Sequence, residues 1–102
     1  MEHITICNSI DDVRLNIDRI DFQLVSLIAE RAQYVKQAAK FKKNTTEVKA
    51  SDRVEQVINK VVTQANELKA PPAVVEAIYR TMIDQFIKTE LEEHKSLNQQ
   101  HT

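Results

Sequence analysis

Apolar residues recur at steps of three and four along the stretch from Ser9 to about Lys43, which contains neither Pro nor Gly. The apolar positions are Ile10, Val13, Ile17, Ile20, Leu24, Leu27, Val35 and Ala38. This spacing predicts a single helix of about 34 residues, and at 1.5 Å per residue it would be roughly 50 Å long. Ser9 suits the N-cap position, and Lys42 and Lys43 are cations suited to a helix C-terminus.

Two further amphipathic stretches follow. The first runs from Ser51 to about Leu68, and the second has Pro72 in its first turn and continues through Leu91. Their apolar positions are Val54, Val57, Ile58, Val61, Ala65 and Leu68, and then Val74, Val75, Ile78, Met82, Ile83, Phe86, Ile87 and Leu91. The chain is therefore predicted to be all-α, with three helices of which one is very long.

The remaining segments are expected to be irregular. Residues 1–8 are predicted to form an arm, residues 44–50 a polar lid that closes over bound ligand, and residues 95–102 a frayed polar tail. We expect all of them to belong to one helical domain over residues 1–102.

The length of the first helix bears on assembly. A compact domain of this size has a radius of gyration of about 13 Å, so a rod of roughly 50 Å would extend far beyond it. No Pro or Gly is present to kink the helix. We therefore predict a two-fold homodimer in which the long helices of two copies cover each other's apolar stripes.

Composition and charge narrow the function classes. With 14 basic and 15 acidic residues the net charge is -1, so neither nucleic acid nor an acidic membrane is expected as a partner and any recognition of an anion must be local. The absence of Gly disfavours Gly-rich phosphate loops, and no apolar run is long enough to span a membrane. Cys7 is the single cysteine, and no basic-then-apolar leader is present, which favours a reducing, cytoplasmic location.

Two cations interrupt the apolar stripe of the first helix. At about 100° per residue, Arg31 points within about 40° of Leu24 and Val35, and Lys42 lies only about 20° from Arg31. Burying charge without a partner is costly. These cations either reach water and pair with carboxylates, or meet an anionic ligand.

Arg53 and Glu90 are also in unusual positions, Arg53 at the positive end of a helix dipole and Glu90 on an apolar helix face. Arg53 lies in the first turn of the second helix, where free backbone N–H groups and a guanidinium together suit an anion; pairing with Asp52 or Glu55 is the alternative. Glu90 faces the apolar side of the third helix, where burial raises the pKa of a carboxyl and favours the neutral, donating acid. A salt bridge to one of the stripe cations is the alternative for Glu90.

Arg14 lies about 100° from Arg31 around the first helix, so it would serve a pocket of the other chain in an antiparallel dimer. Pairing with Asp11 or Asp18 is the alternative.

Several cations and one carboxyl that can be neutral suit a small dianionic substrate. No nucleophile has an adjacent base and the three histidines lie at the chain ends, so neither a metal nor a cofactor is expected. Such a site would act by positioning and electrostatics.

These residues form one recognisable pattern. Its segments are Ile10-Asp11-Asp12-Val13-Arg14, Ile17-Asp18-Arg19-Ile20-Asp21, Glu30-Arg31, Lys42, Asp52-Arg53 and position 90. The pattern resembles the all-α chorismate mutase family over nearly the whole chain. Tyr34-Val35-Lys36 and Lys40-Phe41-Lys42 extend the likeness to the isochorismate pyruvate lyases of salicylate and siderophore biosynthesis.

The resemblance implies an intertwined homodimer with two sites, each completed by an arginine from the other chain. It implies that Arg31 and the partner's Arg14 bind the two carboxylates of the substrate, while Lys42 bonds the ether oxygen and a carboxylate. Arg53 would add charge at the rim, and Glu90 would face the enol-ether oxygen. The apolar wall would comprise Val35, Ile83, Phe86 and Ile87. Both family reactions are pericyclic and need no cofactor.

The chain departs from the family pattern in two ways, and the first is the loss of two acidic residues near Arg53. Mutases usually carry a glutamate directly after the arginine that matches Arg53, where it accepts the 4-hydroxyl of chorismate; here that residue is Val54. An acid expected three residues before Arg53 is Ala50. Both losses favour the lyase, whose substrate carries its hydroxyl at ring carbon 2, unless the register slips by one and Glu55 takes the role.

The second departure is Glu90, where the bacterial enzymes usually have glutamine. An ionised carboxylate would repel the ether oxygen, so activity is expected to require the neutral acid. The main hypothesis is an isochorismate pyruvate lyase with weak chorismate mutase side activity. The alternatives are a chorismate mutase, and a non-catalytic dimeric interaction module in which Glu90 pairs with Lys42.

Overall fold

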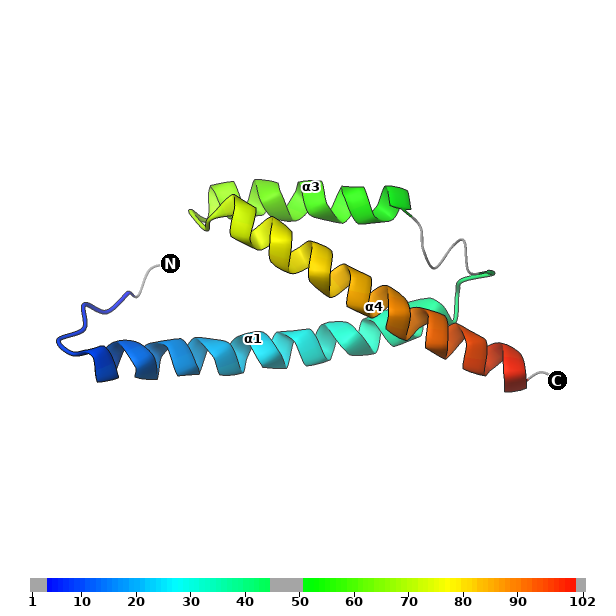
Figure 1. Cartoon of the computed structure of the whole chain (residues 1–102), viewed down its shortest axis with the longest axis horizontal. Helices are drawn as coiled ribbons and strands as arrows, with labels where there is room; N and C mark the ends of the chain where they lie inside the picture. The colour runs from blue at the N-terminus through cyan, green and yellow to red at the C-terminus, as the bar shows by residue number, and fades with distance from the viewer. Residues whose placement is uncertain (1–3, 45–50, 101–102) are drawn as a thin grey trace. The chain divides into compact units, whose positions relative to one another are not determined.

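The computed structural model describes residues 4–44 and 51–100, without the side chains of residues 93, 94 and 96–100. This part of the chain contains helices and no strand, which confirms the all-α prediction. The helices are α1 (Ile10–Ala39), α3 (Ser51–Glu67) and α4 (Pro72–Gln100), as Figure 1 shows. Most of the predicted lid over residues 44–50 lies outside the described residues.

The start of α1 follows from its capping residue. The side-chain Oγ of Ser9 accepts a hydrogen bond of 3.1 Å from the backbone N–H of Asp12, and the Ser9 carbonyl accepts one of 3.2 Å from Val13. Asp11 and Asp12 occupy the first turn, where the positive end of the helix dipole favours acids. The predicted N-cap is therefore confirmed.

The predicted C-terminus of α1 at Lys42–Lys43 is wrong, because the helix ends at Ala39. The N–H groups of Lys40, Phe41 and Lys42 donate to the carbonyls three residues earlier, at 3.1, 3.0 and 3.3 Å. This tightening is common at helix ends, and the local run of cations suits the dipole at any of these positions. Since Lys42 lies beyond the helix, the angle of about 20° from Arg31 that assumed continuous helix does not apply to it.

The helices α3 and α4 form an antiparallel hairpin (Figure 1). Its buried residues are Ile58, Val61, Ala65 and Ile83. Three residues expected on the apolar faces, Leu68, Val74 and Ile78, are instead exposed in the chain. The apolar stripe is wider than the surface that one neighbouring helix covers.

The connection between α3 and α4 contains the left-handed residue Lys69, with φ 60°. The N–H of Ala70 donates to the carbonyl of Ala65 at 2.8 Å, so the chain closes the end of α3 in the manner of a Schellman motif. The Pro71 carbonyl then accepts a bond of 3.1 Å from Val75, which places Pro72 in the first turn of α4, as predicted.

The end of α4 lies further along the chain than the apolar pattern indicated. The helix continues to Gln100, so residues 95–100 of the tail expected to fray are helical. At the other end, residues 4–8 of the predicted arm form neither helix nor strand.

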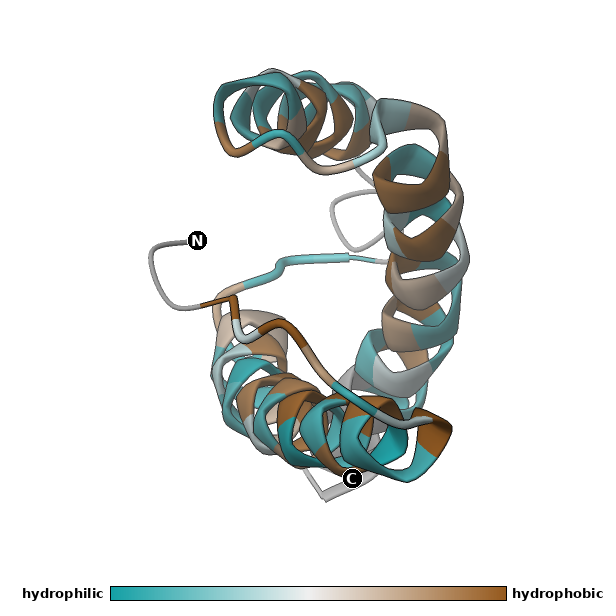
Figure 2. Ribbon diagram, turned by 90° about the vertical axis from the view of Figure 1, so that its left-hand side faces the viewer, coloured by the Kyte–Doolittle hydropathy of each residue, from teal (hydrophilic) through white to brown (hydrophobic). Residues whose placement is uncertain are grey.

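The chain divides within α1 into two units, residues 1–33 and 34–102. In the first unit, the apolar stripe of α1 is exposed in the single chain, with relative exposures from 38% at Val13 to 62% at Leu27. Figure 2 shows apolar positions in brown interspersed with polar positions in teal along the helices. A single domain over residues 1–102 and a homodimer both stay predictions.

Candidate functional site

Four predicted site residues lie on one face of α4. At about 100° per residue, Ile83, Phe86, Ile87 and Glu90 fall within an arc of about 100°. Ile83 is buried and the other three are half-buried; of the residues between them, Asp84, Gln85 and Lys88 are exposed and Thr89 is half-buried. This face of α4 is therefore partly covered within the chain, and Glu90 continues the line of Ile83, Phe86 and Ile87.

The C-terminal part of α1 and the segment after it carry three further predicted residues. Arg31 and Val35 are half-buried and one turn apart on α1, and Lys42 is half-buried just after its end. Ala39, between Val35 and Lys42, is fully buried. These positions differ from residues 17–30 of the same helix, all of which are exposed.

Arg53 lies in the first turn of α3 and is exposed. Val54 follows it and is half-buried, on the same side of α3 as the buried Ile58 and Val61. The position at which a family mutase carries a glutamate is thus apolar and covered in this chain.

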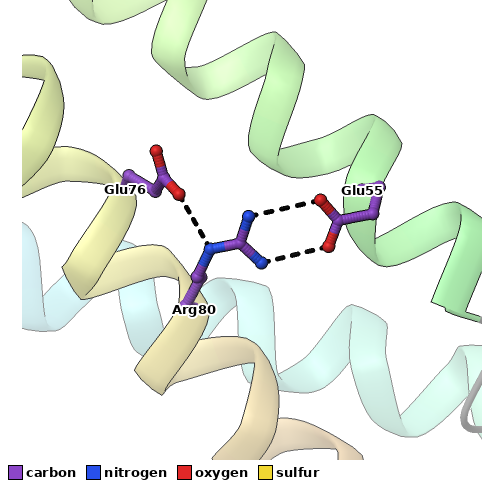
Figure 3. Close-up of polar contacts among 3 residues, drawn as sticks. All are labelled: Glu55, Glu76 and Arg80. Atoms are coloured by element: carbon purple, nitrogen blue, oxygen red, sulfur yellow. Dashed lines mark hydrogen bonds and ion pairs between the residues drawn. The ribbon is translucent and has the colours of Figure 1, made fainter.

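The Glu55 carboxylate bonds Arg80 of α4. Arg80 donates from both terminal nitrogens to the two carboxylate oxygens of Glu55, at 3.0 and 3.2 Å, and from Nε to Glu76 at 2.9 Å (Figure 3). The pairing of Arg53 with Glu55 that the sequence left open is thus replaced by a bidentate pairing with Arg80. Engagement of both oxygens by Arg80 also counts against a hydroxyl-binding role for Glu55.

The ion pair changes the titration of both partners. Hydrogen bonding and the positive charge of Arg80 lower the pKa of Glu55 from its ordinary value of 4.5, and hydrogen bonds from Glu55 and Glu76 raise the pKa of Arg80. Both side chains are largely open to solvent, with 44% of Arg80 and 57% of Glu55 exposed, so screening limits the strength of the pair. Glu55 is therefore ionised throughout the physiological range.

Arg14 is exposed near the start of α1, in the first unit. Its predicted role needs a second chain, and this role stays a prediction.

Two features were missed by the sequence analysis. Arg80 was not singled out, although the i, i+4 spacing of Glu76 and Arg80 is visible in the sequence. In the first unit, the arm and α1 line a cleft of about 290 Å³, where the Asn16 side-chain amide donates to Cys7 Sγ at 3.5 Å. No local sequence signal marks that contact.

Within residues 4–44 and 51–100, no helix combines the length and apolarity needed to cross a bilayer. Among the side chains described there, His, Cys, Asp and Glu form no group of three or more that could hold a metal ion.

The sequence model of a family described as chorismate mutase type II matches residues 13–91. The chain belongs to the chorismate mutase type II family. The matched chorismate mutase type II region includes every predicted site residue, from Arg14 in α1 to Glu90 in α4. The family resemblance inferred from the motifs is thereby confirmed.

The chain is also similar to a curated isochorismate pyruvate lyase from Pseudomonas aeruginosa. The two sequences are 29% identical over 85 residues, which cover 83% of this chain and 84% of the relative. The chorismate mutase type II family and the name of this relative both support an enzyme of chorismate-related catalysis.

Proposed function

We propose that this protein is an isochorismate pyruvate lyase that converts isochorismate to salicylate and pyruvate, with weak chorismate mutase side activity. The observation that carries the proposal is the environment of the two side chains that follow Arg53. Val54 is apolar and half-buried, and the Glu55 carboxylate is engaged by Arg80. Val54 has no acceptor for the 4-hydroxyl of chorismate, and Arg80 holds the Glu55 carboxylate toward α4 and away from that role. The name of the curated relative is independent support.

The proposed chemistry is a pericyclic step assisted by fixed charges. Arg31 and the partner's Arg14 bind the two carboxylates, and Arg53 adds positive charge at the rim. Lys42 bonds the ether oxygen as negative charge develops there during C–O cleavage. A donor that is in place before the reaction stabilises such charge at no cost of reorganisation.

Glu90 has a proposed role as a neutral hydrogen-bond donor to the same ether oxygen. Its location on a face with Ile83, Phe86 and Ile87 supports this role, since apolar surroundings disfavour the ionised carboxylate. These three residues, with Val35, would form the wall against which the ring packs. An apolar wall also excludes water, which strengthens the electrostatic contacts.

The proposed assembly is an intertwined homodimer. The exposed apolar stripe of α1 in the single chain supports it, because an apolar strip of this length marks an interaction surface. A second copy of the same stripe is the simplest cover, since a two-fold interface uses the same surface on both subunits.

The single cysteine supports a cytoplasmic location as part of the same proposal.

The second candidate is a chorismate mutase that forms prephenate. The description of the family favours it, and chorismate shares charge and overall shape with isochorismate. Lyase and mutase would use the same cations and the same apolar wall. They differ in whether the substrate hydroxyl at ring carbon 4 needs an acceptor near Arg53.

The deciding experiment supplies purified protein with isochorismate and, separately, with chorismate. Each assay is run at about pH 5 and about pH 7.5, because a carboxyl with a raised pKa loses its proton between these two values. Salicylate and prephenate are followed side by side. Dominant salicylate formation supports the lyase. Dominant prephenate formation makes the mutase correct, and the absence of turnover and binding of both substrates favours the non-catalytic interaction module.

A further inference from the structure

The two helices of the hairpin are held together unevenly along their length. The buried residues of α3 are Ile58, Val61 and Ala65, and none of residues 51–57 is buried. Figures 1 and 2 show α3 and α4 closest at their connecting turn and separating toward the first residue of α3. The first turns of α3, which carry Arg53, are therefore less deeply packed than residues 58–65, since Val54 and Val57 are only half-buried.

The ion pair of Glu55 and Arg80 spans the helices at this separating end (Figure 3). Its two parallel N–H···O bonds, at 3.0 and 3.2 Å, fix the relative orientation of the groups better than a single bond does. Glu76 accepts from Nε on the other side of the guanidinium, so Arg80 is itself held in place. The pair thus restrains the rotation of the first turns of α3 about the helix axis.

Arg53 shares these turns with Glu55. The two residues are separated by about 200° around the helix, so their side chains point in nearly opposite directions. A rotation of the turn that moves Glu55 moves Arg53 and Val54 by the same angle. Anchoring Glu55 on one side therefore sets the direction of Arg53 on the other.

We propose that Arg80 is a positioning residue that acts through Glu55: it holds the first turns of α3 so that Arg53 and Val54 face the substrate. The same pairing keeps the Glu55 carboxylate, which would repel a dianion, directed away from it. This inference rests on the proposed function, in which Arg53 contacts the substrate at the rim.

A simple charge effect is the competing explanation, and it has the opposite sign in one variant. Glu55→Gln removes a negative charge and by electrostatics alone would improve binding of a dianionic substrate. Loss of positioning instead raises KM. We expect Arg80→Gln, Glu55→Gln and the double variant each to raise KM by a similar factor, about fivefold to tenfold, with kcat within about twofold.

The controls separate positioning from charge and from folding. Lys60→Gln removes one cation from the solvent-exposed side of α3 and should leave KM close to that of the wild type. Arg80→Lys keeps the charge but lacks the bidentate fork, so it should restore KM only in part. The denaturation midpoint should change little in all of these variants, because the ion pair is exposed.

Two results would overturn the inference. One is an unchanged or lower KM in Glu55→Gln; the other is a further rise in KM when Glu55→Gln is added to Arg53→Ala, which would show that Glu55 does not act through Arg53. Amide hydrogen exchange at residues 55–58, which donate to the carbonyls of the first turn, gives a readout independent of turnover. Exchange should accelerate in Arg80→Gln and Glu55→Gln but not in Lys60→Gln.

This design separates the two proposals. If the wild type converts neither substrate, the proposed function fails, and unchanged exchange in Arg80→Gln would refute the restraint on α3 as well. If Arg53→Ala raises KM while Arg80→Gln does not, the function stands and the role of Arg80 is refuted.

Discussion

The first part of α1 and the α3–α4 hairpin share the same kind of sequence but differ in what covers them. Both are amphipathic, with apolar residues at steps of three and four. The hairpin buries Ile58, Val61, Ala65 and Ile83 within the chain, whereas the stripe of α1 from Ile10 to Leu27 is exposed there. An amphipathic pattern thus predicts that a helix has an apolar face to cover, but not which surface covers it.

The difference follows from the connections. Residues 68–71 join α3 to α4 and return the chain antiparallel, so each helix has a neighbour within the same unit. The first part of α1 is preceded by the short arm, whose cleft with α1 involves Val13, Ile17 and Ile20 of the stripe. The rest of the stripe needs a surface that the first unit does not supply.

The largest effect is expected from a charge placed on the uncovered stripe. Leu24→Glu would bury a carboxylate in the interface of each copy, which costs about 3 kcal/mol per chain or more and raises the dimer Kd roughly 10⁴-fold. Leu15→Glu is the matched control, because Leu15 lies about 180° away around α1. In the chain, Leu24 is 52% exposed and Leu15 68%.

Sedimentation velocity at several concentrations measures the outcome. Leu24→Glu should sediment as a monomer and Leu15→Glu as a dimer. A monomeric wild type, or a Leu24→Glu variant that stays dimeric, would refute the assignment of the stripe to a second copy.

The next largest effect is expected on kcat/KM when the half-buried Lys42 is replaced. Lys42→Ala should lower kcat/KM by roughly 10² to 10³, the scale of a lost oxyanion donor, with the dimer intact. Lys40→Ala removes a cation that is exposed, two residues earlier, and should change kcat/KM little. A loss below about threefold for Lys42→Ala would remove Lys42 from the mechanism.

Glu90 offers a pH-dependent test of the same covered region. If the neutral acid donates to the ether oxygen, kcat/KM falls about tenfold per pH unit once the pH exceeds the pKa of Glu90, since the active form is then the minority. Glu90→Gln keeps a donor that does not titrate, so its profile should be flatter. Glu92→Gln, an exposed neighbour on α4, should retain the wild-type profile. Identical flat profiles for the wild type and Glu90→Gln would contradict the role.

The smallest effect is on the hairpin turn. Lys69 has φ 60°, a conformation that costs a residue with a Cβ about 1–2 kcal/mol and glycine almost nothing. Lys69→Gly should therefore raise the free energy of unfolding by about 0.5–1 kcal/mol after the entropy of the more flexible unfolded chain is subtracted. Lys60→Gly, inside α3, should lower it by about 1 kcal/mol. Urea denaturation compares the two, and destabilisation by Lys69→Gly would contradict the assigned turn.

The features predicted well from sequence are those determined by neighbouring residues. The N-cap at Ser9 and the first-turn position of Pro72 depend on side chains and backbone within one turn. The end of α1 at Ala39 was missed because Lys40, Lys42 and Lys43 suit several stopping points equally. Exposure of Ile78 was missed because periodicity defines a face without defining how much of it a neighbour covers.

The candidate site shows the same division. The types and positions of its charged residues are visible in the sequence, and the family match over residues 13–91 includes them. The partner of Glu55 could not be predicted, because Arg80 is 25 residues away and only the packing of α3 on α4 makes them neighbours. The sequence alone therefore leaves Glu55 as a candidate hydroxyl acceptor, whereas in the structure its carboxylate is bonded by Arg80.

The short connection between α3 and α4 also has a consequence for folding kinetics. Contacts across the hairpin join residues close in sequence, from the immediate neighbours of Lys69 to Glu55 and Arg80, so closing them costs little loop entropy. Chains dominated by such local contacts fold fast. We therefore expect the hairpin to form first, at a rate independent of protein concentration. The stripe of α1 would be covered only in a later, bimolecular step whose rate rises with concentration.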